Sequence, residues 1–569
     1  MVIPLARRMI CIPVPLLCVF AVVPTLANVQ ETRPSATLEL VIQANARERA
    51  GAWVDAASIW NRLVLLNPAM PSYWERMGQA SKKAHNYAEG IRGFRRALEL
   101  GASYSGPTEY EIAVCYALSG DKENALLWLE KALALGLRSL TWVQDDEQLE
   151  SLRTEPRFRS FVMVADVQSM TRDRGWRYDL AFLSSELKRR HYSPFRKVSK
   201  KEFDNAVPKL DVRISGLKDE EIEVEFMRLA RMMGDGHTYL RPKHTLGSNT
   251  RALPIQLFFF TEGLFIIRAS PEHRYLVGMR VERIGEHTPE ELLRQLDPII
   301  NQDNKMTPLM IGPELMTCPR MLFGLGLIPN PDRVTITVLE RAGNQRRVLL
   351  KEEPRVSQEG WPSARAEHGP DVPLYLKDLD SNYWFEYVAD AKLVFFQYNK
   401  VHEGKEPLRL FLDRLFRFLN EHDVERFVID LRWNTGGTRL LNRQLIHRLI
   451  RDDKINHEGK LFVVVGRHTV SAGMMLATQI EQNTDAVFAG EPTGSSPNFV
   501  GQDVGIRLPY SGMQGSLSDL YWQNSSATDF RTWIAPSLYT PPSFALYSSN
   551  RDPALEAILG YQPRRGSVK

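Results

Sequence analysis

Residues 461–475 read LFVVVGRHTVSAGMM and contain a strand pattern, a short turn and the start of a helix pattern. The first five residues are all apolar, which is typical of a strand buried on both faces. The helix pattern begins near Ser471, so this serine is expected at a helix N-terminus. Free backbone amides and the helix dipole favour negative charge there, as an acyl-transfer oxyanion requires. Serine is also a favoured helix N-cap, so this segment by itself leaves both roles open.

Two further segments bear on the role of Ser471. Residues 426–437, RFVIDLRWNTGG, form a second buried-strand pattern that runs into a pair of glycines. Gly436 and Gly437 let backbone amides approach a ligand, so either amide could act beside that of Ala472 in an oxyanion hole. Residues 489–498, AGEPTGSSPN, are typical of a turn-rich loop after a strand at 486–488.

In this order and spacing the three segments resemble the core of the S41 peptidases, the family of the carboxyl-terminal processing proteases and the tricorn protease core. The resemblance covers roughly residues 170–560. It implies a crotonase/ClpP-like α/β spiral and a serine nucleophile, which falls on Ser471. It also implies a substrate cleft lined by the loop residues Pro492, Thr493, Gly494, Ser495, Ser496 and Asn498.

The general base is the main departure from the processing-protease branch. That branch pairs its serine with a lysine about 25 residues further on, but the only lysine after Ser471 is Lys569. The tricorn-like branch takes a histidine from the helical segment before the core, and His237 follows an amphipathic helix here. A neutral imidazole can accept a serine proton near neutral pH. Gly236 stands where the tricorn branch has a serine.

The third catalytic residue is less well marked. A base needs a partner on its other ring nitrogen, and the resemblance places an acid about sixty residues after the serine, where Asp529 lies. Glu491 and Asp235 are alternatives for this role. His468, three residues before Ser471, is an alternative base, which we rank below His237 because the resemblance favours the latter.

The N-terminus has the form of a secretory signal. Residues 1–27 combine two arginines, a short apolar run and a small residue at Ala27. We therefore expect an exported protein, periplasmic or extracellular, with no stable membrane span after cleavage.

Composition bounds the remaining function classes. The chain has 569 residues, 43% of them hydrophobic and 25% charged, with a formal net charge of +4. This is typical of a multidomain globular protein and gives no case for nucleic acid binding. Cys115 and Cys318 lie in different expected domains, which does not indicate a disulfide framework. No histidine or cysteine cluster has metal-ligand spacing, so we expect neither a metal nor another cofactor.

A helical pattern repeats across residues 36–165. Trp53, Trp60 and their neighbours recur at Tyr87 and Phe94, and again at Lys122 and Leu129, a spacing of about 34 residues that resembles tetratricopeptide repeats. Such repeats commonly bind proteins or peptides, so this part predicts a partner surface. An irregular helical bundle is the alternative.

The remaining chain divides into four expected parts. Residues 170–250 are a helical lead-in that contains His237, and residues 253–352 are rich in strand patterns. The segment 277–285 resembles a strand of the PDZ domain that S41 members carry, although no clear carboxylate-binding loop is present. Residues 353–372 have the composition of a linker, and residues 373–569 alternate strands and helices as an α/β core does.

Three functions are compatible with these features. The first is a secreted serine peptidase that acts on peptides or proteins through Ser471 and a histidine base. The second is a non-catalytic peptide-binding protein on a degenerate core, which the missing lysine and the missing serine before His237 would favour. The third is crotonase-type acyl-thioester chemistry, which the export signal disfavours because coenzyme A substrates are intracellular.

Overall fold

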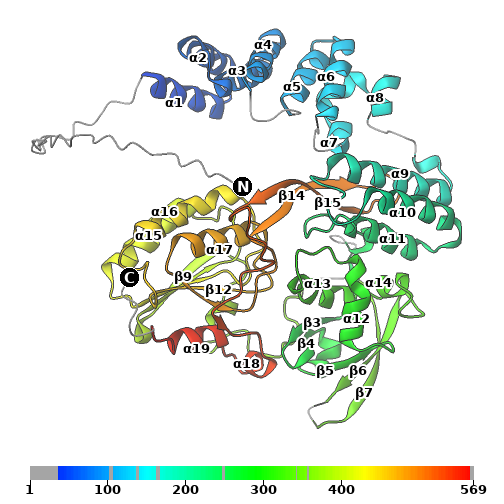
Figure 1. The fold of residues 1–569 in the computed structure, drawn as a ribbon, viewed down its shortest axis with the longest axis vertical. Helices are drawn as coiled ribbons and strands as arrows, with labels where there is room; N and C mark the ends of the chain where they lie inside the picture. Colours follow the sequence, from blue (N-terminus) through cyan, green and yellow to red (C-terminus); the bar gives the residue numbers. More distant parts are fainter. Residues whose placement is uncertain are drawn as a thin grey trace, which may run out of the picture. The chain divides into compact units, whose positions relative to one another are not determined.

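The computed structural model describes residues 36–101, 107–135, 140–161, 167–245, 250–340, 342–354 and 358–563. The expected signal, 1–27, lies outside the described residues. The chain divides into two compact units, Met1–Ala132 and Leu133–Lys569 (Figure 1).

The first unit is built of helices that follow one another along the chain and contact their neighbours. The second helix of each pair begins at Trp53, Tyr87 and Lys122, the positions at which the sequence repeats. The apolar core of the first unit includes Trp60 and Trp74. The helices are α1 (Ala36–Arg49), α2 (Trp53–Leu66), α3 (Pro71–Lys83), α4 (Tyr87–Glu99), α5 (Pro107–Leu118) and α6 (Lys122–Ala134).

The second unit starts with helices that lead to His237. Ser199 and Glu202 form a capping box that fixes the start of α10. The helix before His237, α11, buries Phe226, Leu229 and Ala230 on its apolar face. The helices of this part are α7 (Leu140–Asp145), α8 (Pro156–Phe161), α9 (Arg172–Arg190), α10 (Lys200–Arg213) and α11 (Asp219–Arg231).

A five-stranded antiparallel sheet follows, in the order β3-β4-β5-β6-β7. Three helices, α12 (Pro289–Leu296), α13 (Met306–Met316) and α14 (Pro319–Gly324), lie between its strands β5 and β6 in the chain. The strands are β3 (Ile255–Phe260), β4 (Gly263–Ala269), β5 (Arg280–Ile284), β6 (Arg333–Leu339) and β7 (Gln345–Lys351). The short strands β2 (Arg251–Ala252) and β8 (Glu353–Pro354) pair with each other.

The centre of the second unit is a six-stranded sheet in the order β16-β13-β12-β11-β10-β9. Strands β10 to β13 and β16 run parallel, and β9 is antiparallel. Every residue of β12 is buried, because apolar clusters cover both faces of the sheet. The strands are β9 (Tyr383–Val388), β10 (Leu393–Tyr398), β11 (Arg426–Asp430), β12 (Leu461–Val465), β13 (Val487–Gly490) and β16 (Leu538–Tyr539).

Helices α15 (Leu408–Glu421), α16 (Asn442–Arg451) and α17 (Ser471–Asn483) connect the parallel strands, and α18 (Phe544–Ser548) and α19 (Pro553–Leu559) end the described chain. A long hairpin, β14 (Asn498–Arg507) and β15 (Gln514–Gln523), leaves this core and pairs with β1 (Tyr239–Arg241), directly after His237. The hairpin thereby brings the His237 segment to the core, which the sequence did not predict.

The structure is thus a multidomain mixed α/β protein with a helical N-terminal part and sheets further along the chain. The crotonase-like and PDZ-like assignments and the finer domain boundaries stay predictions. Within the described residues, no helix is both long and apolar enough to cross a bilayer.

Candidate active site

Ser471 is the first residue of α17 and follows β12 after a turn of five residues, 466–470. Its φ is +53°, a left-handed conformation that side-chain-bearing residues seldom adopt. Such strain persists only where the surrounding structure enforces it, and it is common in catalytic residues. Val470, not Ser471, occupies the N-cap position and makes no side-chain cap. The N-cap role that the sequence left open for Ser471 is therefore not the one the structure gives it.

The glycine pair lies against Ser471 and the start of α17. A Cβ built on Gly436 would lie 2.6 Å from Cβ of Ser471 and 2.8 Å from the amide nitrogen of Ala472. The amide of Gly436 donates to Oδ1 of Asn434 at 3.0 Å, so it is already engaged. Among the described residues, no acceptor is bound by the amides of Gly437 or Ala472. These two amides are therefore available to bind an acceptor.

The turn that carries His237 is organised by the buried carboxylate of Asp235. Oδ1 accepts from the amides of His237 and Thr238, at 2.9 and 2.7 Å, and from the hydroxyl of Ser518 at 2.7 Å. Oδ2 bonds to Nε2 of His191 at 2.8 Å. Burial raises the pKa of Asp235, but the bonds from His191 and Ser518 outweigh it and leave the pKa below its usual value. Asp235 therefore holds the backbone of His237 and not its ring.

The His237 ring stacks on Phe499 of β14, with centroids 5.3 Å apart and the planes within 11°. Its Nδ1 atom is buried and has no hydrogen-bond partner among the described residues. The same is true of Oδ2 of Asp303, whose Oδ1 accepts from the amide of Gly236 at 2.9 Å. Asp303, which is bound to the backbone of Gly236 just before His237, thus has a buried oxygen without a donor. His237 has a buried ring nitrogen without a partner.

Asp303 and His237 also interact electrostatically. Burial raises the pKa of Asp303, and the neighbouring Asp235 raises it further, whereas His237 and the bond from the amide of Gly236 act in the opposite direction. A positive charge on His237 would be the natural counter-ion of this carboxylate. Asp303 lies three residues before the start of α13, far in sequence from the segments around His237 and Ser471, and no local pattern marks it.

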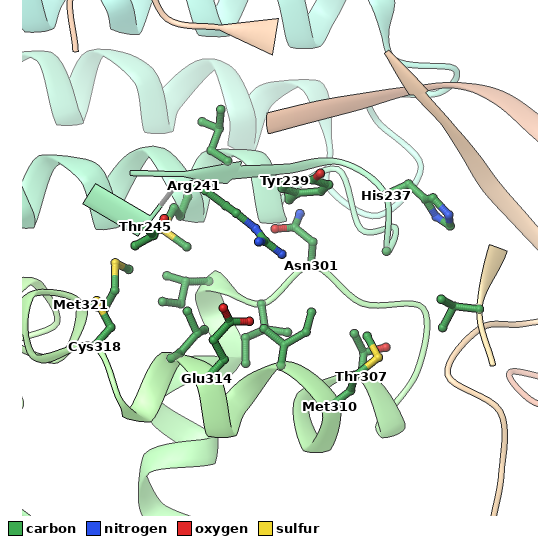
Figure 2. A pocket seen from close by; sticks show the side chains of 18 of the residues that line it. His237, Tyr239, Arg241, Thr245, Asn301, Thr307, Met310, Glu314, Cys318 and Met321 are labelled. Atoms are coloured by element: carbon green, nitrogen blue, oxygen red, sulfur yellow. The ribbon is translucent and has the colours of Figure 1, made fainter. Parts of the chain in front are cut away.

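His237 and Ser471 line the same cavity of about 340 Å³, which we call the first cavity. Gly236, Asp303, Thr435 and Ser495 line the same space. Figure 2 shows it from close by: Arg241 points from β1 toward Glu314 on α13, and His237 lies at one end. No hydrogen bond joins the His237 ring to Ser471 among the described residues, and such bonds commonly tighten only when substrate is bound.

Asp529 does not take the place beside His237 that the sequence predicted. Its carboxylate accepts from the Ser525 hydroxyl at 2.7 Å and from Nε and Nη2 of Arg531 at 3.0 and 2.8 Å. The bond from Arg531 is the largest influence that lowers the pKa of Asp529. This carboxylate is engaged in the loop after β15, so we correct the assignment.

The remaining alternatives also lie elsewhere. Glu491 forms a bidentate ion pair with the buried Arg467, at 2.7 and 2.8 Å. The ring of His468 is tilted by 40° against that of Trp433, and His468 lines a second cavity that does not include Ser471. Burial lowers the pKa of His468 to about 3, assisted by Arg467.

The predicted substrate loop is divided between two roles. Gly494 and Ser495 line the first cavity. Thr493, Ser496 and Asn498 hold the loop in shape, since their side chains bond to the carbonyls of Ser495, Thr532 and Ser526, respectively. Pro492 is not among the residues that line the first cavity.

No family model matches the chain, and no curated protein sequence matches it. Solved structures do resemble it at low identity. Mature CPAF is 12% identical, covers 68% of this chain and 96% of its own, and gives a TM-score of 0.47.

The photosystem II D1 C-terminal processing protease is 11% identical, with coverage of 68% and 96% and a TM-score of 0.34. The tricorn protease is 12% identical, with coverage of 68% and 36% and a TM-score of 0.35. The structures that this chain resembles thus include the processing-protease and tricorn types that its sequence resembles. Since each TM-score is below 0.5, we rest no functional argument on these likenesses.

Proposed function

We propose that this chain is a serine peptidase in which Ser471 is the nucleophile and His237 the general base. One observation carries the proposal: a serine in a strained left-handed conformation and a histidine from a distant segment line the same cavity. Strained nucleophiles and convergent polar groups in one cavity are features of catalytic sites.

The chemistry follows from these groups. Nε2 of His237 takes the proton of the Ser471 hydroxyl as the oxygen attacks the carbonyl carbon of a peptide bond. The carbonyl oxygen becomes an oxyanion, which the amides of Gly437 and Ala472 stabilise. His237 then gives the proton to the leaving amine, and a water molecule releases the acyl group by the same steps. We assign Asp303 the task of holding Nδ1 of His237 and balancing its positive charge.

The residues that line the first cavity indicate which kind of substrate side chain would bind there. Part of its wall is apolar, with Ile300, Met310, Ile311, Leu315 and Met321 among the lining residues, and Arg241 and Glu314 also line the cavity. An apolar side chain next to the scissile bond would be buried there, at about 25 cal/mol per Å² of surface removed from water. The proposed substrates are therefore peptides or proteins with an apolar residue at this position.

The test is covalent labelling by a fluorophosphonate probe, together with hydrolysis of a peptide library. We expect labelling of the wild type and none of Ser471→Ala. Ser119→Ala is the matched control, because its hydroxyl bonds to the carbonyl of Tyr116 and the residue does not line the first cavity. Equal labelling of wild type and Ser471→Ala would overturn the assignment of the nucleophile.

A non-catalytic peptide-binding protein is the second candidate. It is favoured by the lack of a hydrogen bond between His237 and Ser471 among the described residues and by the engaged amide of Gly436. Binding of library peptides with neither turnover nor labelling would support it. We further propose export, on the basis of residues 1–27, and a partner surface on the helical repeats of the first unit.

A further inference from the structure

A second cavity, of about 480 Å³, lies between β3 and the ends of the parallel strands β11, β12 and β13. Its volume is in the range of ordinary small-molecule sites. Aromatic side chains make up much of its wall, namely Phe258, Phe260, Tyr375, Trp433 and Tyr547. Ser471 and His237 do not line it.

Three loops contribute to both cavities. Each loop follows one of the parallel strands, and in each the residues nearer the strand face the second cavity while the next ones face the first. The pairs are Trp433 and Thr435 after β11, His468 and Ser471 after β12, and Glu491 and Ser495 after β13. The rings of Trp433 and His468 lie 4.9 Å apart and join two of these loops. A ligand in the second cavity would therefore contact the loops that shape the proposed active site.

The wall of the second cavity also has unused donors. Nε1 of Trp433 and Nε of Arg268 and Arg365 are buried and have no acceptor among the described residues. A buried N–H group without an acceptor is unfavourable, so a ligand that supplies acceptor oxygens would be stabilised here.

The charges around the second cavity favour an anion. Arg268 and Arg365 share one carboxylate, that of Glu367, at 2.6 and 3.9 Å. The other anions are engaged or peripheral: Glu491 is bound by Arg467, Asp378 accepts two backbone amides, and Asp380 is exposed. His468 stays neutral because burial holds its pKa near 3, and its ring presents another aromatic face.

We propose that the second cavity is a regulatory site for a small aromatic or apolar molecule that carries an anionic group. The anionic oxygens bind Trp433 and Arg365, the apolar part lies among the aromatic side chains, and occupancy alters the three shared loops. The binding site itself goes beyond the proposed peptidase activity, whereas its regulatory role rests on the proposed function of Ser471 and His237.

Binding is tested with anilinonaphthalene sulfonate, an aromatic anion, by calorimetry on the full chain. We expect saturable binding to a single site, weakened about tenfold by Trp433→Phe and by Arg365→Gln, since each removes a hydrogen-bond donor to the anion. Trp128→Phe in α6 and Arg347→Gln in β7 are the matched controls and should bind as the wild type does. Equal affinity in all five proteins would show that the probe binds elsewhere and would overturn the site.

The link to the active site is tested by hydrogen exchange with and without the probe. We expect altered exchange in segments 434–438, 469–473 and 492–496, and none of this change in Trp433→Phe at the same probe concentration. Binding without any change in these three segments would reject the regulatory role. Because exchange requires no catalysis, this outcome is distinct from a failure of the peptidase proposal.

Discussion

Gly436 and Ser471 are so close that a Cβ on the glycine would lie 3.0 Å from the serine Oγ and 2.6 Å from its Cβ. Gly436 has a φ of +101°, and Ser471 one of +53°. Two residues in unusual backbone conformations, from loops about 35 residues apart in the chain, thus fix each other's position.

Gly436→Ala should therefore lower the rate of fluorophosphonate labelling by about 100-fold, because the added methyl group would displace Ser471 from the oxyanion donors. Gly326→Ala is the control: its φ is +75°, but an added Cβ meets nothing within 4 Å. That variant should lose only about 1 kcal/mol of unfolding free energy and keep its labelling rate. Equal labelling rates in the two variants would contradict the close contact.

Asp303→Asn should lower the rate of peptide hydrolysis about 100-fold or more, since the positive charge on His237 would lose its counter-ion. Asp529→Asn should leave the rate unchanged, because its carboxylate is bound by Arg531 and Ser525. Comparison of kcat for the two variants distinguishes the two assignments of the third residue. The reverse result would restore Asp529.

The pH profile of hydrolysis should carry the signature of Asp303. Burial raises the pKa of this carboxyl, so protonation of Asp303 should add its own loss of activity on acidification to the loss caused by protonation of the His237 base, and at a higher pH than an ordinary aspartate would give. This role requires the ionised form. A profile of residual Asp303→Asn activity that kept the same acidic limb would show that Asp303 is not its source.

Asp235→Asn should lower the unfolding free energy by about 3 kcal/mol, because a buried charge that satisfies four donors is lost. The pKa of Asp235 is lower in the folded protein than in the unfolded chain. Its contribution is therefore present above the unfolded pKa and lost as the pH falls. Urea unfolding measures both effects, and the exposed Asp371→Asn should change neither. A loss no larger than that of Asp371→Asn would show that the turn does not depend on Asp235.

His468 should make the protein less stable in acid. Its pKa is about 3 when folded and ordinary, about 6.5, when unfolded, so the unfolded chain gains a proton first as the pH falls. Stability that is present above pH 6.5 is lost toward pH 3, by up to about 2 kcal/mol between pH 7 and pH 5. His468→Gln should show a smaller loss over this interval in urea unfolding. An identical loss would mean that the folded protein accommodates the charged ring.

The sequence determined the elements of the core, because their patterns are local. The apolar run before Ser471 forms β12, and the pattern after Ser471 forms α17. The apolar run before Asp430 forms β11, which ends at Asp430. These patterns predicted strands that end in turns, whereas the structure shows that the strands are parallel and that their loops therefore follow the same edge of the sheet. The role of Ser471 remains a proposal, but its place at a helix N-terminus follows from its neighbours in the chain.

Only the tertiary structure decided which charged groups lie beside His237. Asp303 and Asp529 both lie far from His237 in sequence, and nothing in their local patterns separates them. The hairpin of β14 and β15 pairs with β1 and sets Phe499 under the His237 ring. Arg531 holds Asp529 in its own loop. Periodicity reports which face of an element is buried, whereas electrostatic partners depend on contacts between distant segments, which a linear pattern does not encode.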